Sequence, residues 1–294
     1  MSDKIIRGIT KDKYVRFFIV DSTDLTKEAT EMHNLSMTNT VLFGRMLNGA
    51  LMLGVDNKAD TGSITIKVNG DGPVSGAVVT ANNKGDVKGY VYNPQVELPL
   101  TEDRKDFNVK GALGKGMLSV TKDVGMKTTY TGKVELMYGT IAQDLTYYFV
   151  KSEQIPSSVG LGVLVNPDGS VKQSGGFMIQ LMPDAPEEII VKIENNLSVF
   201  PNMTDVMDMG YSIKKIISEM ILKDFDLKFT EEVSAQYKCE CTELKMKQSL
   251  NLLNKDELED IYNNEEGVEV KCHYCNKSYN FNKQIVKGIL DRKS

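Results

Sequence analysis

Hydrophobic and polar residues alternate with a period of two in several short stretches of the first 180 residues. Residues 63–68 place Ile64, Ile66 and Val68 on one face, which predicts a half-buried strand. Turn segments rich in glycine, asparagine and proline lie at 70–73 and 82–85. A strand-like segment follows each turn, at 74–80 and 87–92 respectively. The pattern predicts an antiparallel meander.

Other parts of this region predict further strands and a few helices. The expected strands are residues 14–20, 116–124, 130–137, 158–165 and 171–180. The expected helices are a short one that begins at Asp24 or Thr26 and ends near His33, one at 38–53 that buries one side, and one at 140–154. Strands interleaved with segregated helices predict an α+β domain, a mixed sheet-and-helix domain over residues 1–182.

After Pro183 and Pro186 the hydrophobic period becomes helical. A stripe of apolar side chains at helical spacing comprises Ile213, Ile216, Ile217, Met220 and Ile221. We therefore predict a helical linker at residues 183–234 that packs on the α+β domain and on the C-terminal domain, because so large an apolar surface invites association when exposed. The remaining residues, 235–294, predict a small C-terminal domain with helices at 244–253, 256–262 and 282–290.

The composition is that of a globular protein. The chain has 294 residues, of which 41% are hydrophobic and 26% charged, so a wholly disordered, collagen-like or coiled-coil chain is excluded. The best early apolar stretch, 15–20, is too short to span a membrane and contains Arg16. The N-terminus has no apolar core of a secretory signal. We expect a cytoplasmic protein with no membrane partner.

All four cysteines lie in the last 56 residues, as Cys239-x-Cys241 and Cys272-x-x-Cys275. In an intracellular chain such a cluster indicates metal or redox chemistry. Two tight pairs of thiolates match a tetrahedral Cys₄ zinc site, with His273 as a spacer. Because about 60 residues make a thin core, zinc would supply much of the folding free energy, about 10–16 kcal/mol in small zinc domains.

The zinc has two possible roles, a purely structural one and a redox switch. The Cys-x-Cys pair is unusual in zinc ribbons, and the cysteines of each pair are close enough along the chain to oxidise internally. Such oxidation would remove all four ligands, release the metal and unfold the domain. The sequence thus contains the parts of a switch.

The chain resembles the heat-shock protein 33 family of redox-regulated chaperones over essentially its whole length. The cysteine signature Cys239-Glu-Cys241 with Cys272-His-Tyr-Cys275 carries the resemblance most specifically. Similar segments in the first domain are 70–73, 89–90, 130–136, 141–148, 152–156 and 175–176 with Gln180.

The resemblance implies an ATP-independent holdase of the cytoplasm, without enzymatic activity, that binds unfolded or aggregation-prone client proteins under oxidative stress. It implies that the reduced form binds zinc through Cys239, Cys241, Cys272 and Cys275 and is inactive. Oxidation would form the disulfides Cys239–Cys241 and Cys272–Cys275 and release zinc. It also implies a homodimer in the oxidised state.

Two other functions have different sequence requirements. A zinc-ribbon nucleic-acid-binding protein with a structural zinc needs a basic face interleaved with aromatic residues. Instead, residues 183–294 carry 21 acidic and 15 basic residues, and we expect Tyr237, Tyr274, Tyr279 and Phe281 to fill the small core. A thiol-disulfide oxidoreductase needs a thioredoxin-like βαβ unit around Cys-x-x-Cys, which the pattern lacks. We therefore expect no nucleic-acid partner.

Overall fold

A computed structural model describes residues 3–59, 61–102, 106–125, 128–264 and 266–293. The chain divides into two compact units, an N-terminal unit, Met1–Lys238, and a C-terminal unit, Cys239–Ser294. Residues 183–234, the expected linker, pack within the N-terminal unit. The division into three functional parts stays a prediction. The mixture of sheets and helices confirms the α+β fold class.

One antiparallel sheet of the N-terminal unit has the strand order β10-β1-β2-β9-β8. Its strands are β1 (Lys4–Thr10), β2 (Val15–Asp21), β8 (Ser157–Val165), β9 (Val171–Leu181) and β10 (Leu227–Ser234). Strand β2 lies between β1 and β9, with Phe18 opposite Met178. Its consecutive residues Phe17 to Val20 are all buried, because both faces of the sheet are covered.

The second sheet has the order β11-β5-β4-β3-β6-β7. Its strands are β3 (Ser63–Gly70), β4 (Gly76–Asn82), β5 (Asp86–Val91), β6 (Gly116–Asp123), β7 (Tyr130–Glu135) and β11 (Gln236–Tyr237). Consecutive hairpins join β3, β4 and β5, which confirms the predicted meander. In the β4–β5 turn, Gly85 has a φ of +79°, and a Cβ there would lie 2.1 Å from the carbonyl oxygen of Ser234.

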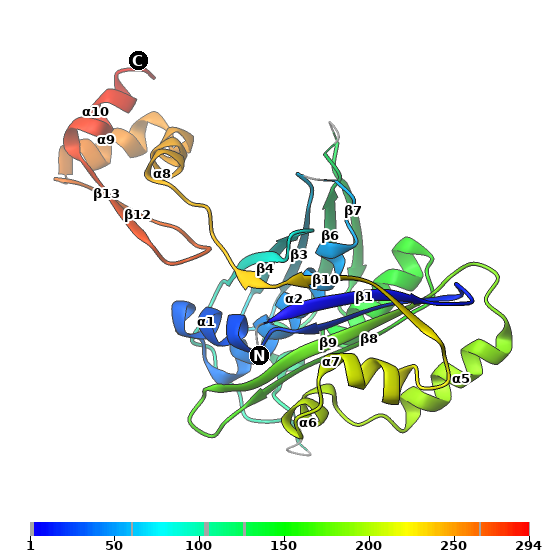
Figure 1. Ribbon diagram of the computed structural model, residues 1–294. Helices are drawn as coiled ribbons and strands as arrows, with labels where there is room; N and C mark the ends of the chain where they lie inside the picture. Colours follow the sequence, from blue (N-terminus) through cyan, green and yellow to red (C-terminus); the bar gives the residue numbers. More distant parts are fainter. Residues whose placement is uncertain (1–2, 60, 103–105, 126–127, 265, 294) are drawn as a thin grey trace. The chain divides into compact units, whose positions relative to one another are not determined.

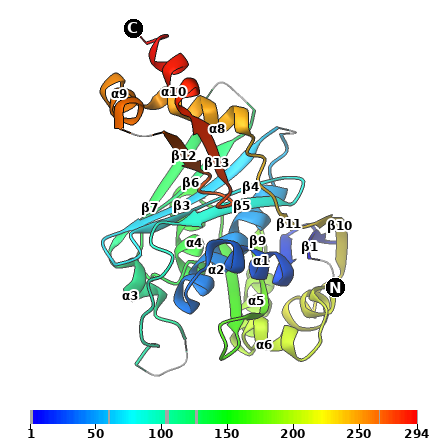
Figure 2. The same cartoon turned by 90° about the vertical axis from the view of Figure 1, so that its left-hand side faces the viewer.

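Helix α2 (Met37–Val55) fills the space between the two sheets (Figure 2). The sequence predicted burial on one side, but the structure buries the helix on all sides, from Thr38 to Val55. Its side chains contact β3, β4 and β5 on one side and β2, β8 and β9 on the other. A helix packed between two sheets has no solvent-facing stripe. Around it lie α1 (Thr23–His33), α3 (Val109–Leu113), α4 (Ala142–Tyr148) and its π-helical continuation η1 (Phe149–Glu153).

Helices from the expected linker cover the other face of the β1–β2–β9 sheet (Figure 1). They are α5 (Glu187–Ser198), α6 (Met203–Asp208), α7 (Ile213–Lys215) and the π-helical η2 (Ile216–Ile221). Four residues of the predicted stripe, Ile213, Ile216, Ile217 and Ile221, are at most 3% exposed and pack with Phe17 and Ile179. The α+β part of the chain therefore covers this stripe, as predicted.

The end of the expected helical linker is instead extended. Strand β10 pairs with the edge of β1, and β11 pairs in parallel with β5. Leu227, Phe229 and Val233 are the partly buried residues of β10, and they follow a period of two. This segment forms a strand because it pairs with the edge of β1. The helical pattern of the preceding residues gave no indication of this pairing.

The C-terminal unit has a core of five buried side chains: Leu250, Leu258, Phe281, Val286 and Ile289. Its elements are α8 (Glu243–Ser249), η3 (Leu250–Leu252), α9 (Lys255–Asn264), β12 (Gly267–Lys271), β13 (Ser278–Asn282) and α10 (Lys283–Leu290). The three helices predicted for this region are confirmed, while the hairpin of β12 and β13 was not foreseen. No helix in the described ranges is long and apolar enough to cross a membrane.

Candidate metal centre

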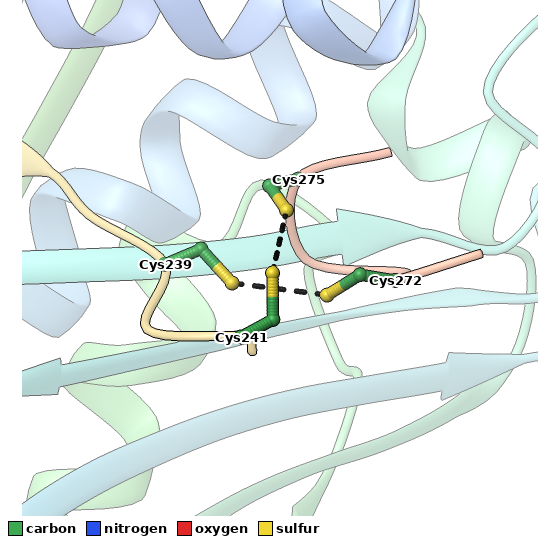
Figure 3. A group of neighbouring side chains, drawn as sticks. All are labelled: Cys239, Cys241, Cys272 and Cys275. Atoms are coloured by element: carbon green, nitrogen blue, oxygen red, sulfur yellow. Dashed lines mark hydrogen bonds between the residues drawn. The ribbon is translucent and has the colours of Figure 1, made fainter. Parts of the chain in front are cut away.

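The four cysteine side chains meet at one place in the C-terminal unit (Figure 3). All four Sγ atoms lie within 4.8 Å of one another. Cys239 Sγ is 3.7 Å from Cys272 Sγ, and Cys241 Sγ is 3.3 Å from Cys275 Sγ. The thiols are free, with Cys272 buried and the others half-buried. This arrangement of soft donors can hold a metal ion.

A tight turn between β12 and β13 presents Cys272 and Cys275. The Cys272 carbonyl accepts hydrogen bonds from the backbone N–H groups of Cys275, at 3.3 Å, and Asn276, at 2.8 Å. Asn276 has a φ of +57°, a left-handed conformation that asparagine tolerates better than most residues. The Cys272 N–H in turn donates to Lys277 O at 2.9 Å. These bonds hold both sulfurs on the same side of the turn.

The other pair lies on the segment that leads into α8. The side chain of Thr242 accepts a hydrogen bond from Lys245 N at 3.2 Å and so caps this helix. Lys245 Nζ donates to Glu240 O, which lies between the two cysteines, at 2.9 Å. Local bonds thus shape each cysteine segment, but only the fold of the unit brings the two segments together.

Tyr279 of β13 links the two cysteine segments. Its hydroxyl oxygen lies 3.2 Å from Cys241 Sγ and 3.2 Å from the Cys241 carbonyl oxygen. The sequence interpretation placed Tyr279 in the small core and missed this contact. The expected place in the core is itself correct for both aromatic residues, since Tyr279 packs partly buried against that core and Phe281 is 1% exposed within it. The sequence offered little indication of this contact, because it did not predict β13. A tyrosine four residues after Cys275 also belongs to no known motif.

The four sulfurs differ in acidity. Burial alone would raise the pKa of Cys241, but hydrogen bonds from Tyr279 and the other cysteines lower it to about 7. Burial raises the pKa of Cys275 far above its usual value, and contacts with Cys241 and Cys239 add to the rise. Of these two thiols, Cys241 therefore loses its proton more readily, because a neighbouring S–H can donate a hydrogen bond to its thiolate.

The two histidines and Tyr237, which the sequence analysis also considered, do not belong to the sulfur cluster. His273 is exposed and is not among the clustered donors in the described chain. His33 and Tyr237 both belong to the N-terminal unit, where they are buried. Tyr237 was expected in the small C-terminal core, and this was wrong, because β11 pairs with β5 and buries its side chain against α1 and β5.

Comparisons with known proteins agree over the whole chain. A family model described as Hsp33 protein matches residues 3–282. A 33 kDa chaperonin of Agathobacter rectalis is 44% identical over 289 residues, which cover 98% of this chain and 100% of that protein. A 33 kDa chaperonin of Clostridium perfringens is 42% identical and covers 100% of this chain and 93% of its own length.

A solved structure extends the similarity to three dimensions. The crystal structure of the 33 kDa chaperonin (heat shock protein 33 homolog) from Thermotoga maritima superposes with a TM-score of 0.92 at 36% identity. The match covers 100% of this chain and 99% of that one. The similarity therefore includes both units and the cysteine segments.

Proposed function

Since this chain belongs to the Hsp33 family, we propose that it is a redox-regulated, ATP-independent holdase chaperone of the cytoplasm, whose reduced form binds zinc and is inactive. The relatives named as 33 kDa chaperonins support the chaperone activity. The convergence of four cysteine sulfurs within 4.8 Å is the single observation that carries the redox and metal part of the proposal.

The geometry of the cluster fits zinc. Four sulfurs at about 2.3 Å from a tetrahedral zinc would be about 3.8 Å apart. The separations of 3.7 Å between Cys239 and Cys272 and 3.3 Å between Cys241 and Cys275 are near this value. Four thiolates complete a closed structural shell and leave no open position for a substrate. Cys239, Cys241, Cys272 and Cys275 are therefore the proposed ligands.

The proposed switch is the loss of these ligands. Oxidation joins Cys239 to Cys241 and Cys272 to Cys275, and each disulfide removes two thiolates. Among the described residues of the C-terminal unit, five side chains form the buried core. Bound zinc contributes about 10–16 kcal/mol of apparent folding free energy in small zinc domains and would therefore dominate the stability of so small a core. Without zinc we expect this unit to unfold.

The proposed active form exposes apolar surface to unfolding client proteins. Helices α5 to η2 bury a large apolar layer on the β1–β2–β9 sheet. Loosening of this layer after oxidation would supply an adaptable apolar surface, with Met203 and Met207 among its flexible side chains. Such binding requires no catalytic residue and no nucleotide. The proposed oxidised form is a homodimer, and no nucleic acid or membrane is a proposed partner.

The experiment that tests this function compares reduced and oxidised protein in three measurements. We expect about one zinc per chain before oxidation and less than a tenth of that afterwards. Suppression of aggregation of a thermally unfolding client should appear only after oxidation, together with binding of a hydrophobic dye. Equal suppression in both states would contradict the switch. Tight RNA or DNA binding at low salt without redox dependence would instead favour a zinc-ribbon nucleic-acid-binding protein.

A further inference from the structure

Strand β8 is the last strand of its sheet, and no other strand of the described chain pairs with its outer edge. Its sequence, Ser-Ser-Val-Gly-Leu-Gly-Val-Leu-Val, contains no charged residue and no proline. Soluble proteins usually protect an edge strand with such residues, because an open edge is a template for a further strand. This edge therefore has the properties of a place where an extended polypeptide adds.

The backbone of β8 presents unused hydrogen-bonding groups at this edge. Val159 N points away from β9, since it donates to the Thr146 hydroxyl of α4 at 3.3 Å. Residues two apart in an antiparallel strand have the same orientation, so Leu161 and Val163 also turn their N–H and C=O groups outward. Within the part of the chain that the structure describes, no hydrogen bond reaches these outward groups of Leu161 and Val163.

A groove of about 700 Å³ runs along the same edge. Residues 160–165 of β8 line it, and it has a wall on each face of the sheet. Arg45 of α2 and Phe107 form the wall on the α2 side, while Phe200 and Met203 form the wall on the side of the linker helices. We call this space the edge groove. Side chains of an added strand alternate between the two faces, so each wall would receive every second side chain.

The charges that line the edge groove are matched within it. Arg45 Nη2 donates to both carboxylate oxygens of Asp106, at 2.9 and 2.7 Å. Asp205 Oδ2 accepts a hydrogen bond from Asn202 Nδ2 at 3.0 Å. The rest of the lining is largely apolar side chains and β8 backbone. The edge groove is thus complementary to an extended segment without charge, which brings its own backbone groups and apolar side chains.

The two walls distinguish a single strand from a second copy of this chain. Two copies that paired through β8 would be related by a twofold axis, so the same surface would meet itself. The walls of one copy would then stand against the walls of the other on both faces of the sheet. A single extended segment carries no walls and fits between them.

From these observations we propose that the edge groove binds an extended, uncharged segment of an unfolding client protein by β-strand addition, through the outward backbone groups of Leu161 and Val163. The inference rests on the proposed chaperone function and deepens it, because it assigns a place and a conformation to the bound client. Main-chain hydrogen bonds would supply the affinity, and the two walls would select apolar side chains.

This site agrees with an inactive reduced form. An added strand of about six residues is about 20 Å long and contacts only a small part of a client. The apolar layer under α5 to η2 stays buried in the reduced fold. The edge groove therefore captures a segment weakly in both states, and retention of a whole client requires the surface that oxidation exposes.

The first test uses the reduced full chain and a fluorescent, capped eight-residue peptide that alternates valine with threonine. The matched probe is the same peptide N-methylated at its four central residues, which lacks the N–H donors. We expect it to bind at least about tenfold more weakly, as loss of two or more hydrogen bonds implies. This comparison uses unchanged protein and does not depend on the folding of a variant.

Hydrogen exchange locates the bound peptide. At a peptide concentration of about ten times its Kd, exchange of the amide hydrogens of Leu161 and Val163 should slow about tenfold, because only the free protein exchanges them. Amides of β7, the last strand of the other sheet, are the reference and should not change.

A variant pair tests the edge groove itself. Leu164→Lys places a charge in the groove at a partly exposed position of β8, in the way that natural edge strands block addition. Leu164→Met keeps the position apolar and is the control. We expect Leu164→Lys to bind the peptide at least about tenfold more weakly than Leu164→Met, which should match wild type within about twofold.

Three results would each overturn the inference: equal binding of the two peptides, unchanged exchange at Leu161 and Val163, or equal peptide affinity of Leu164→Lys and Leu164→Met. If sedimentation shows a reduced wild-type dimer that Leu164→Lys converts to a monomer, the occupant is a second copy and the inference is wrong.

The outcomes also separate the inference from the proposed function. Peptide binding at the edge groove without suppression of aggregation after oxidation would contradict the redox-regulated holdase and leave the peptide site. Suppression after oxidation without peptide binding would contradict the edge groove alone.

Discussion

The hydroxyl of Tyr237 lies 2.9 Å from Nε2 of His33, in a buried site two residues before the first cysteine of the cluster. The same hydroxyl accepts a hydrogen bond from Gly89 N at 3.1 Å and donates one to Gly89 O at 2.8 Å. Because the hydroxyl proton is given to Gly89, Nε2 of His33 is the donor to Tyr237. These bonds fix the C-terminal end of the N-terminal unit to strand β5 and helix α1.

Replacing this tyrosine should loosen the strand that precedes the cluster. Tyr237→Phe leaves buried polar groups of His33 and Gly89 without this hydroxyl, which should lower the free energy of unfolding by about 1–3 kcal/mol. Chemical denaturation measures the loss, and hydrogen exchange should speed up at Lys238 N, which bonds to Val87 O. The control is Tyr92→Phe, whose exposed hydroxyl makes a 3.4 Å contact with Asn69. Equal stability of the two variants would show that the buried hydroxyl contributes little.

Removing one sulfur should abolish metal binding. Cys272→Ser takes away the buried member of the cluster, and we expect zinc content to fall from about one per chain to below about 0.2, because a structural site needs its four ligands. The C-terminal unit should then become protease-sensitive, while the N-terminal unit stays folded. Ser278→Ala, on β13 of the same hairpin, is the control. Full zinc retention in Cys272→Ser would disprove the four-sulfur site.

The disulfide pairing of the oxidised protein should differ from the closest contacts in the folded one. The short contacts join Cys241 to Cys275 and Cys239 to Cys272. Once zinc leaves and the unit unfolds, loop closure favours Cys239–Cys241 and Cys272–Cys275, because short loops close at the lowest entropic cost. Peptide mapping should find these two disulfides. A dominant Cys241–Cys275 disulfide would indicate that oxidation occurs within the folded unit.

Weakening the apolar layer should expose surface without oxidation. Ile217 is a residue of η2 with no exposed surface, and it packs in the apolar layer against the sheet. Ile217→Ala should cost about 2–5 kcal/mol through the lost contacts and the cavity. The reduced variant should therefore bind a hydrophobic dye and suppress client aggregation at a lower temperature than wild type. Val199→Ala, at a position that is 73% exposed, should change neither property. Wild-type behaviour of Ile217→Ala would separate this layer from client binding.

Stability should depend on pH through Asp3. Its carboxylate accepts hydrogen bonds from Asp24 N and Leu25 N at the start of α1, at 3.0 and 2.6 Å. Burial raises the pKa of Asp3 to about 6 from 3.8, although these bonds oppose the rise. The folded state therefore holds the proton longer than the unfolded state, and the stabilisation present below pH 3.8 is lost as the pH rises through about 6.

Asp3→Asn should lack this dependence. Its stability relative to wild type, from denaturation at a series of pH values, should improve steadily between about pH 4 and pH 6 and then level off. The comparison with wild type cancels the contributions of other carboxyl groups. A constant difference across this range would show that Asp3 does not titrate there.

The sequence alone determined the features that depend on short-range pattern. The period of two in residues 63–68 and the turns after it predicted the meander, and the spacing of Cys239, Cys241, Cys272 and Cys275 predicted one cluster. Such patterns are reliable because a strand alternates its faces and a tight cysteine pair can bind one metal without long-range search. The resemblance drawn from the cysteine signature likewise indicated the family.

Only the tertiary structure decided which surfaces meet. Helix α2 is buried on all sides because two sheets enclose it, and β10 is a strand because the edge of β1 lies free to pair with it. Tyr237 packs beside His33 and not in the C-terminal core expected for it, and the Tyr279 hydroxyl contacts Cys241. In both cases strand pairing positions the side chain. These contacts join residues far apart along the chain. Local pattern and propensity do not encode such contacts, since they depend on the packing of whole elements.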